Sequence, residues 1–168
     1  MSGVTARNAA KKVFAEFFDE VKKIDLLKIA KAWGIEIFFE PFNDDTSGVL
    51  VVDSSKTSIL INSKDSKERQ KFTLGHELGH FHLHKPAGVH VDTSITMARN
   101  ANSKLGKDIQ EIEANQFAAE LIMPEDFLKK DAEEFTKGLD EKTVEKLSKK
   151  YSVSILAMQN RLSSLELI

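Results

Sequence analysis

The chain carries the stretch RQKFTLGHELGHFHLH at residues 69–84, which contains the pattern H-E-x-x-H from His76 to His80. On a helix, residues four positions apart lie on one face, so these two histidines can direct imidazole nitrogens at one metal ion. Glu77 lies beside them and can act as the general base toward a water in an open coordination position. The pattern is therefore typical of zinc-dependent hydrolases. The alternative is a buried helix whose histidines are structural.

The residues around this pattern indicate one largely buried helix over about residues 65–84. Asp65 begins a segment that resembles a capping box, with Glu68 three positions later, and Pro86 cannot continue a helix. Gly75 and Gly79 each cost about 1 kcal/mol relative to Ala inside a helix. We therefore expect another backbone, or a substrate strand, to pass close to these two glycines.

Length and composition describe an ordinary globular chain. With 168 residues, 41% of them hydrophobic and 30% charged, it is long enough for one compact domain with a real core. The net charge of -2 gives no overall attraction to nucleic acid or to an anionic membrane. The chain has no cysteine, so a zinc ion would be bound by His and carboxylate groups. The sequence shows neither a signal peptide nor an apolar run long enough to span a bilayer, which favours a cytoplasmic location.

Hydrophobic periodicity and turn residues predict an α+β fold, with a small, mostly antiparallel sheet beside the metal helix and a helical C-terminal part. The expected strands cover residues 35–39, 48–53 and 57–62. The expected helices cover residues 6–22, 25–33, 65–84, about 109–123, 124–135 and two short segments at the C-terminal end. Residues 86–108 show no clear period and are expected to form a loop, either at the active site or on an ordinary surface.

A catalytic zinc ion usually takes three protein ligands, so one ligand must come from outside the H-E-x-x-H pattern. His84 shares the helix face of His76 and His80, but it lies about 12 Å from His76 along the helix axis, which is too far to share one ion. His82 points to the opposite side of the helix. The third ligand is therefore expected elsewhere in the chain.

Carboxylates on the next predicted helix are the candidates. Glu113 and Glu120 are seven residues apart and share a face lined by small Ala residues, and helical spacing alone does not distinguish them. Glu111 falls on a different side and is expected to be solvated. His90 and Asp92, in the predicted loop, are weaker candidates.

Two blocks of the sequence together resemble the ImmA/IrrE family of metallopeptidases. They are residues 69–80 (RQKFTLGHELGH) and residues 113–124 (EANQFAAELIMP). Upstream, residues 25–27, 34–35, 47–48 and 61–62 are also similar, so the resemblance covers about residues 8 to 165. Gly75 stands where Ala is usual in the family.

The resemblance implies a minimal gluzincin-like metalloprotease domain, similar in arrangement to thermolysin. Residue by residue, it implies His76, His80 and Glu113 as metal ligands and Glu77 as the catalytic base. The expected cofactor is one zinc ion per chain, with another divalent ion such as Mn²⁺ as the alternative. Members of the family cleave helix-turn-helix transcriptional repressors. The expected function is therefore a zinc-dependent endopeptidase that acts as an anti-repressor in transcription regulation, and its expected partner is a helix-turn-helix repressor encoded nearby.

We expect the metallopeptidase domain to cover residues 1–138, with a helix-turn-helix-like helical pair over residues 139–168 packed on it. The apolar stripe of this pair should be buried and consists of Ile155, Met158, Leu162 and Leu165. Its basic residues are largely offset by acidic ones, so neither sequence-specific nucleic-acid binding nor membrane binding is expected. Two other functions stay open: a DNA-binding helix-turn-helix module, and a metal-bound regulator that binds a repressor without cutting it. Glu77 argues against the second, because binding alone needs no base.

Catalysis also requires a donor for the oxyanion and acceptors that orient the metal-binding histidines. The sequence leaves the donor open among His82, His90, Arg99 and Tyr151. The plausible acceptors are Asn115, Glu120 and Asp92.

Overall fold

The computed structural model of the chain describes residues 3–19, 24–43, 45–85, 88–93, 104–133 and 140–168. Seven helices and four strands lie in these ranges, which confirms the α+β expectation. The strands are β1 (Ile35–Glu40), β2 (Thr46–Val52), β3 (Thr57–Asn62) and β4 (Gly88–Thr93). The helices are α1 (Gly3–Phe17), α2 (Leu26–Ala32), α3 (Lys67–His84), α4 (Lys104–Ile122), α5 (Glu125–Glu133), α6 (Glu141–Tyr151) and α7 (Ile155–Ser164).

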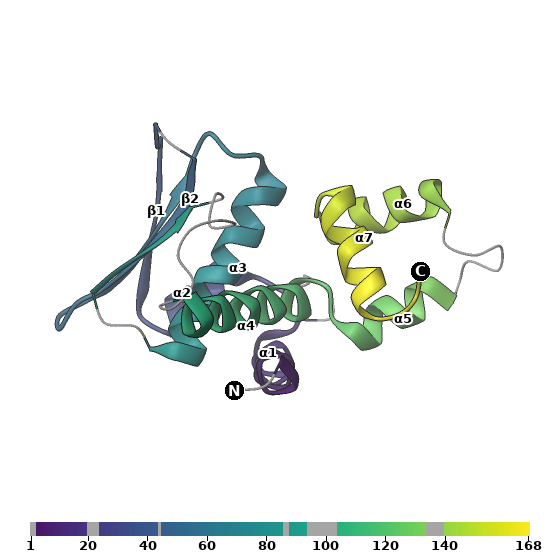
Figure 1. Cartoon of the computed structure of the whole chain (residues 1–168), viewed down its shortest axis with the longest axis horizontal. Coiled ribbons are helices and arrows are strands. Elements are labelled where there is room, and N and C mark those ends of the chain that lie inside the picture. Colours follow the sequence, from purple (N-terminus) through teal and green to yellow (C-terminus); the bar gives the residue numbers. More distant parts are fainter. Residues whose placement is uncertain (1–2, 20–23, 44, 86–87, 94–103, 134–139) are drawn as a thin grey trace.

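The four strands form one mixed sheet in the order β1-β3-β2-β4. Strand β2 is antiparallel to both β3 and β4, whereas β1 runs parallel to β3. In Figure 1 the sheet lies at one end of the molecule, α3 packs beside it, and α5, α6 and α7 form a group at the other end. Helix α4 runs between these two parts, so residues on α4 can contact both α3 and the C-terminal helices.

Helix α3, which carries the H-E-x-x-H pattern, begins one residue later than the capping-box pattern predicts. The N-cap is Ser66, whose side chain accepts a hydrogen bond from the backbone N–H of Arg69, and not Asp65. The helix ends at His84, and the C-cap residue Lys85 adopts a left-handed conformation with φ of 45°. Its central residues from Thr73 to His80 are all buried, as the sequence predicts for a helix in the core.

Helices α3 and α4 pack closely because α3 has two glycines at their contact. A Cβ atom on Gly79 would lie 3.2 Å from both the Cα and the carbonyl oxygen of Ala114. A Cβ atom on Gly75 would lie 3.3 Å from the Cβ of Ala118. The expectation that a backbone passes close to these glycines is therefore confirmed, and that backbone is α4.

The predicted loop over residues 86–108 is wrong in two places. Residues 88–93 form β4, which pairs with β2 at the edge of the sheet, and α4 already begins at Lys104. The strand has only six residues and begins at Gly88, where φ is +89°, so no clear alternation marks it in the sequence. Residues 94–103 lie outside the described part of the chain.

The C-terminal helices are held to α4 by a buried charge. Arg161 on α7 donates hydrogen bonds to the carboxylate of Glu120 and to the carbonyl oxygen of Met123, the latter at 3.1 Å. Both charged side chains are almost fully buried. A second tie comes from Lys71 on α3, whose Nζ donates to the carbonyl oxygen of Tyr151 at 2.8 Å. Met158 and Leu162 are buried as expected, whereas Ile155 is 48% exposed.

No helix within the described ranges combines the length and the apolar composition that a bilayer-spanning segment requires.

Arg161→Met should strongly destabilise the fold, because it leaves the Glu120 carboxylate buried without its positive partner. Removing one member of a buried ion pair typically costs about 3–5 kcal/mol, so we expect a loss of that size in the free energy of unfolding measured by urea denaturation. Lys149→Met is the matched control, because it removes an exposed i,i+4 pair with Glu145 and should change stability little. Equal stability of the two variants would contradict the anchoring role of Arg161.

Candidate metal centre

Three side chains from two helices converge on one point. The Nε2 atoms of His76 and His80 lie 2.9 Å apart. The carboxylate of Glu111 lies across from them, with Oε2 3.2 Å from His76 Nε2 and Oε1 3.3 Å from His80 Nε2. Both histidines are buried, and the side chain of Glu111 is 29% exposed. The cluster therefore opens to solvent on the side of Glu111.

The other ring nitrogen of His76 is fixed by the same helix that supplies Glu111. His76 Nδ1 lies 3.0 Å from the amide oxygen Oδ1 of Asn115, one turn after Glu111 on α4. An amide oxygen accepts hydrogen bonds, so Nδ1 carries the proton and Nε2 presents its lone pair to the cluster. Of the acceptors expected from the sequence, Asn115 has this role, whereas Glu120 pairs with Arg161.

The donor set and its spacing fit a divalent metal ion. Tetrahedral ligands about 2.0–2.1 Å from a zinc ion lie about 3.3 Å from one another. The two Nε2 atoms are 2.9 Å apart, and each lies 3.2–3.3 Å from a different oxygen of the Glu111 carboxylate, close to that edge length. The short distance between the two Nε2 atoms could also be a hydrogen bond between the imidazoles. Such a hydrogen bond would not require a carboxylate that contacts both rings, as the carboxylate of Glu111 does. Two nitrogens and one oxygen are also ligands that zinc commonly takes in proteins.

Glu77 lies beside this cluster on the flank of α3 that faces the sheet. Its side chain is fully buried, and Gly48 on β2 packs directly against it. A Cβ atom at position 48 would lie 3.0 Å from Glu77 Oε1 and 2.5 Å from the Cγ2 atom of Thr73. Glycine is therefore the residue that allows the strand to lie over the carboxylate.

The structure brings together His76 and His80 as the sequence predicts, but the carboxylate beside them is Glu111 and not Glu113. Glu111 was expected to be solvated; its side chain is 29% exposed, and its carboxylate lies against the two imidazoles. Residues two apart on a helix project about 200° from each other around the axis, so Glu111 and Glu113 leave α4 on different sides. Glu113 is buried with its Oε2 3.8 Å from His84 Nε2, where it lies near the C-terminal end of α3.

The spacing of residues on α4 distinguishes Glu111 from Glu113, and the sequence-based prediction did not use it. Glu111 and Asn115 are spaced i,i+4, so they lie on one face and can approach both ring nitrogens of one histidine. Glu113 and Glu120 also share a face, but Glu120 is used by Arg161. The spacing of Glu111 and Asn115, a carboxylate followed by an amide four residues later, was therefore the pattern that could have predicted Glu111 as the ligand.

The residues considered for oxyanion stabilisation are not in this cluster, as far as the structure describes them. The imidazole of His82 stacks on Trp33 at a centroid distance of 4.9 Å, and burial lowers its pKa. The hydroxyl of Tyr151 donates to Asp131 Oδ2 at 2.7 Å, and burial raises the pKa of that hydroxyl. The side chains of His90, Asp92 and Arg99 lie outside what the structure describes.

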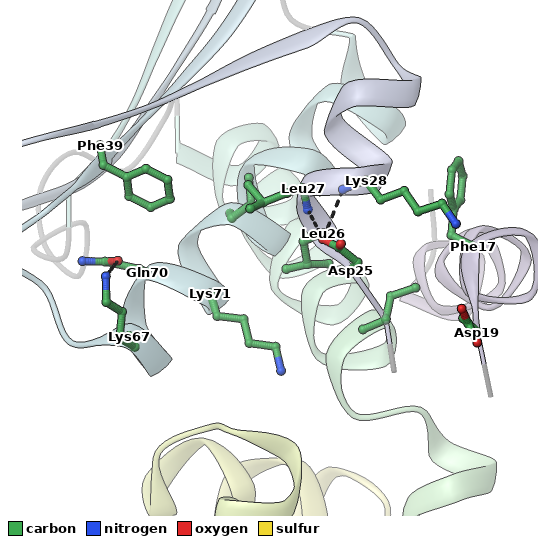
Figure 2. A pocket seen from close by; sticks show the side chains of 12 residues that line it. Phe17, Asp19, Asp25, Leu26, Leu27, Lys28, Phe39, Lys67, Gln70 and Lys71 are labelled. Carbon is green, nitrogen blue, oxygen red and sulfur yellow. Dashed lines mark hydrogen bonds between the residues drawn. The ribbon is translucent and has the colours of Figure 1, made fainter. Parts of the chain in front are cut away.

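A cavity of about 830 Å³ lies on another face of α3 and does not belong to the cluster. Figure 2 shows its lining, in which Lys67 and Lys71 of α3 lie with Leu27 of α2 and Phe39 of β1. Lys67 and Lys71 project from the side of the helix opposite to His76. This cavity therefore contributes nothing to the metal centre.

A buried H-E-x-x-H helix with a carboxylate from a second helix defines a metallopeptidase-type centre. Residues 30–163 match the peptidase M78 family, described as the IrrE N-terminal-like domain, and the chain belongs to this family. The family confirms the resemblance inferred from the two sequence blocks and supports a metallopeptidase.

Relatives with curated descriptions are consistent with this family. The chain is 37% identical over 101 residues to the phage-like element PBSX protein XkdA of Bacillus subtilis (60% of this chain, 43% of that protein). It is 33% identical over 82 residues to the metallopeptidase ImmA of the same organism (49% and 44%). It is 32% identical over 93 residues to the uncharacterized immunity region protein 2 of Bacillus phage phi105 (54% and 54%). The chain thus spans about half the length of these relatives.

The geometry predicts which carboxylate matters for metal binding. Glu111→Ala should lower the affinity for Zn²⁺ by more than about 100-fold, because it removes a ligand, whereas Asn115→Ala should lower it about 10- to 100-fold through loss of histidine orientation. Titration against a chromophoric chelator measures both values. Glu113→Ala is the matched control and should bind Zn²⁺ nearly as tightly as the unaltered protein. Loss of metal in Glu113→Ala, with retention in Glu111→Ala, would contradict this assignment.

Proposed function

We propose that the protein is a zinc-dependent endopeptidase of gluzincin-like arrangement in which His76, His80 and Glu111 hold one zinc ion. The observation that supports this most directly is the convergence of the two Nε2 atoms and the Glu111 carboxylate next to the buried Glu77. This ligand set replaces the one that the resemblance implied, in which Glu113 was the third ligand. Bound there, the ion would lower the pKa of a water molecule toward ~7 and polarise a scissile carbonyl.

Glu77 supplies the proton transfer in this proposal. Its carboxylate accepts a proton from the attacking water and then donates it to the leaving amine, so that one group serves both steps of amide hydrolysis. Gly48 allows β2 to lie close to this carboxylate. Asn115 contributes by holding His76 in the tautomer whose Nε2 faces the cluster.

We propose a helix-turn-helix transcriptional repressor as the substrate, so that cleavage relieves repression. The support comes from the family and from two relatives, one named as a metallopeptidase and the other as an immunity region protein. The division into a metallopeptidase domain (residues 1–138) and a helical pair (residues 139–168) also stays a prediction. The helical pair includes α6 and α7, and the family match covers α6 and extends to residue 163 in α7.

Glu77→Gln tests the chemistry separately from the fold. The substitution is nearly isosteric and removes only the base, so we expect unchanged Zn²⁺ content and unfolding temperature but a ~10²–10⁴-fold slower cleavage. Cleavage is measured by mass spectrometry after incubation with the repressor encoded beside the gene. Chelation of the metal by EDTA should abolish cleavage, and added Zn²⁺ should restore it. Full activity of Glu77→Gln would refute the proposed role of this residue.

Gly48→Ala tests the contact between β2 and the base. The added methyl group collides with Thr73 and approaches Glu77, so the carboxylate must move, and we expect a loss of cleavage of roughly 10²-fold. Zn²⁺ binding should be retained, because none of the three proposed ligands lies on β2. Val49→Ala, which alters the neighbouring position on the opposite face of the strand, is the control and should remain active. Cleavage by Gly48→Ala at the rate of the control would contradict the positioning role of Gly48.

A further inference from the structure

A groove of about 600 Å³ lies between the N-terminal half of α3, α4 and α7. It is separate from the cavity of Figure 2, which is lined by residues on the opposite side of α3. Its lining includes Phe72 of α3, Ile112 and Ala119 of α4, and Leu156 of α7. The groove is thus formed mainly by α3, α4 and α7, and Arg7 of α1 and the charged side chains of Glu68 and Arg69 also line it.

The groove adjoins the candidate metal centre at Asn115. Phe72 lies one helical turn before His76, and Ile112 is the residue after Glu111. Asn115 lines the groove and also contacts His76 Nδ1 at 3.0 Å. A chain that is bound with its scissile bond at the metal centre can therefore place a neighbouring side chain in this groove.

The lining combines exposed apolar groups with a buried polar acceptor. Ile112 and Leu156 are 55% and 65% exposed although both are large and hydrophobic. Gln116 also lines the groove, and its Oε1 atom is buried without a hydrogen-bond partner in the described residues. A buried acceptor of this kind is costly unless a donor reaches it. A peptide offers both complements, an apolar side chain and backbone N–H groups.

The helices around the groove are held in place before any ligand binds. Arg161 fastens α7 to the end of α4 through Glu120 and the carbonyl of Met123. The tie from Lys71 to Tyr151 connects α3 to the end of α6. A groove that is already formed binds a ligand without the cost of ordering its walls.

We propose that this groove is the specificity subsite of the peptidase and takes a large apolar side chain, such as Leu or Phe, of the peptide segment that is cleaved. The proposal rests on the proposed peptidase function and assigns part of the substrate surface to α7. Leu156 contacts the substrate side chain from α7, and Ile112 contacts it from α4.

Binding to a catalytically inactive protein tests the groove independently of cleavage. The probes are four pools of fluorescein-labelled dodecapeptides with Leu, Phe, Asp or Gly fixed at one central position and Gly, Ser, Thr or Asn at the others. Their affinities for Zn²⁺-loaded Glu77→Gln protein are measured by fluorescence anisotropy. Burial of one large apolar side chain should make the Leu and Phe pools bind about 10-fold or more tighter than the Gly and Asp pools.

Leu156→Glu, made in the Glu77→Gln protein, should abolish this preference, and Leu156→Ala should reduce it without introducing a charge. Ile155→Glu is the matched control, because Ile155 is the preceding residue on α7, is also exposed and does not line the groove. It should keep the preference. Each variant is compared with the Glu77→Gln protein only if the two have the same unfolding temperature. If Leu156→Glu does not fold, the peptide preference of Leu156→Ala is the test of the groove.

Failure of the groove and failure of the peptidase function give different results. Equal affinities for all four pools, including no measurable binding by any of them, would overturn the subsite, and so would a preference that survives both Leu156 variants. A second copy of the chain as occupant would appear as a dimer in analytical ultracentrifugation that Leu156→Glu dissociates, and this would also overturn it. Preferential binding of the Leu and Phe pools, together with no cleavage by the unaltered protein, would support the groove and refute the peptidase function.

Discussion

The close contact between α3 and α4 is the constraint on which the metal centre depends. Gly75 and Gly79 allow the backbone of α4 to approach within a distance at which a methyl group would already be crowded by Ala114 and Ala118. At that separation Glu111 and Asn115 reach the two ring nitrogens of His76. A larger residue at either glycine would push α4 away, and a side chain as short as Asn could no longer contact the imidazole. The cost of glycine in a helix interior, about 1 kcal/mol each, is thus offset by a contact that the site requires.

The buried pair of Glu120 and Arg161 has a different consequence. A buried ion pair is weak evidence for stability, because desolvation of the two charges can exceed their attraction. Its effect here is to fix the positions of three helices. Arg161 also donates a hydrogen bond to the carbonyl oxygen of Met123 at the end of α4. The carboxylate of Glu120 also accepts a hydrogen bond from the backbone N–H of Glu125 at the start of α5. One buried charge therefore fixes the turn from α4 to α5 and the approach of α7. The groove beside Asn115 exists because that approach is fixed.

Sequence patterns predicted the elements with strong local signals. The H-E-x-x-H helix, the three strands before it and the helical C-terminal part are all where the periodicity places them. Strand β4 was missed because it is held by pairing with β2, which is a tertiary contact. Its short sequence does not by itself predict a strand. The choice of Glu113 failed to match the structure for a related reason. Spacing shows which residues share a face of α4, but only the packing of α4 against α3 determines which face meets His76.

The two functional parts of the centre depend on different contacts of one helix. His76 and His80 project toward Glu111 on the flank that meets α4, whereas Glu77, about 100° further around the axis, projects toward β2. The proposed metal binding therefore depends on the packing of α3 against α4, and the position of Glu77, the proposed base, depends on the packing of α3 against the sheet. A single turn of helix can join the two functions because both neighbours carry glycine or alanine where they approach it. The described residues that form the candidate centre therefore lie on α3, on its neighbour α4 and on strand β2.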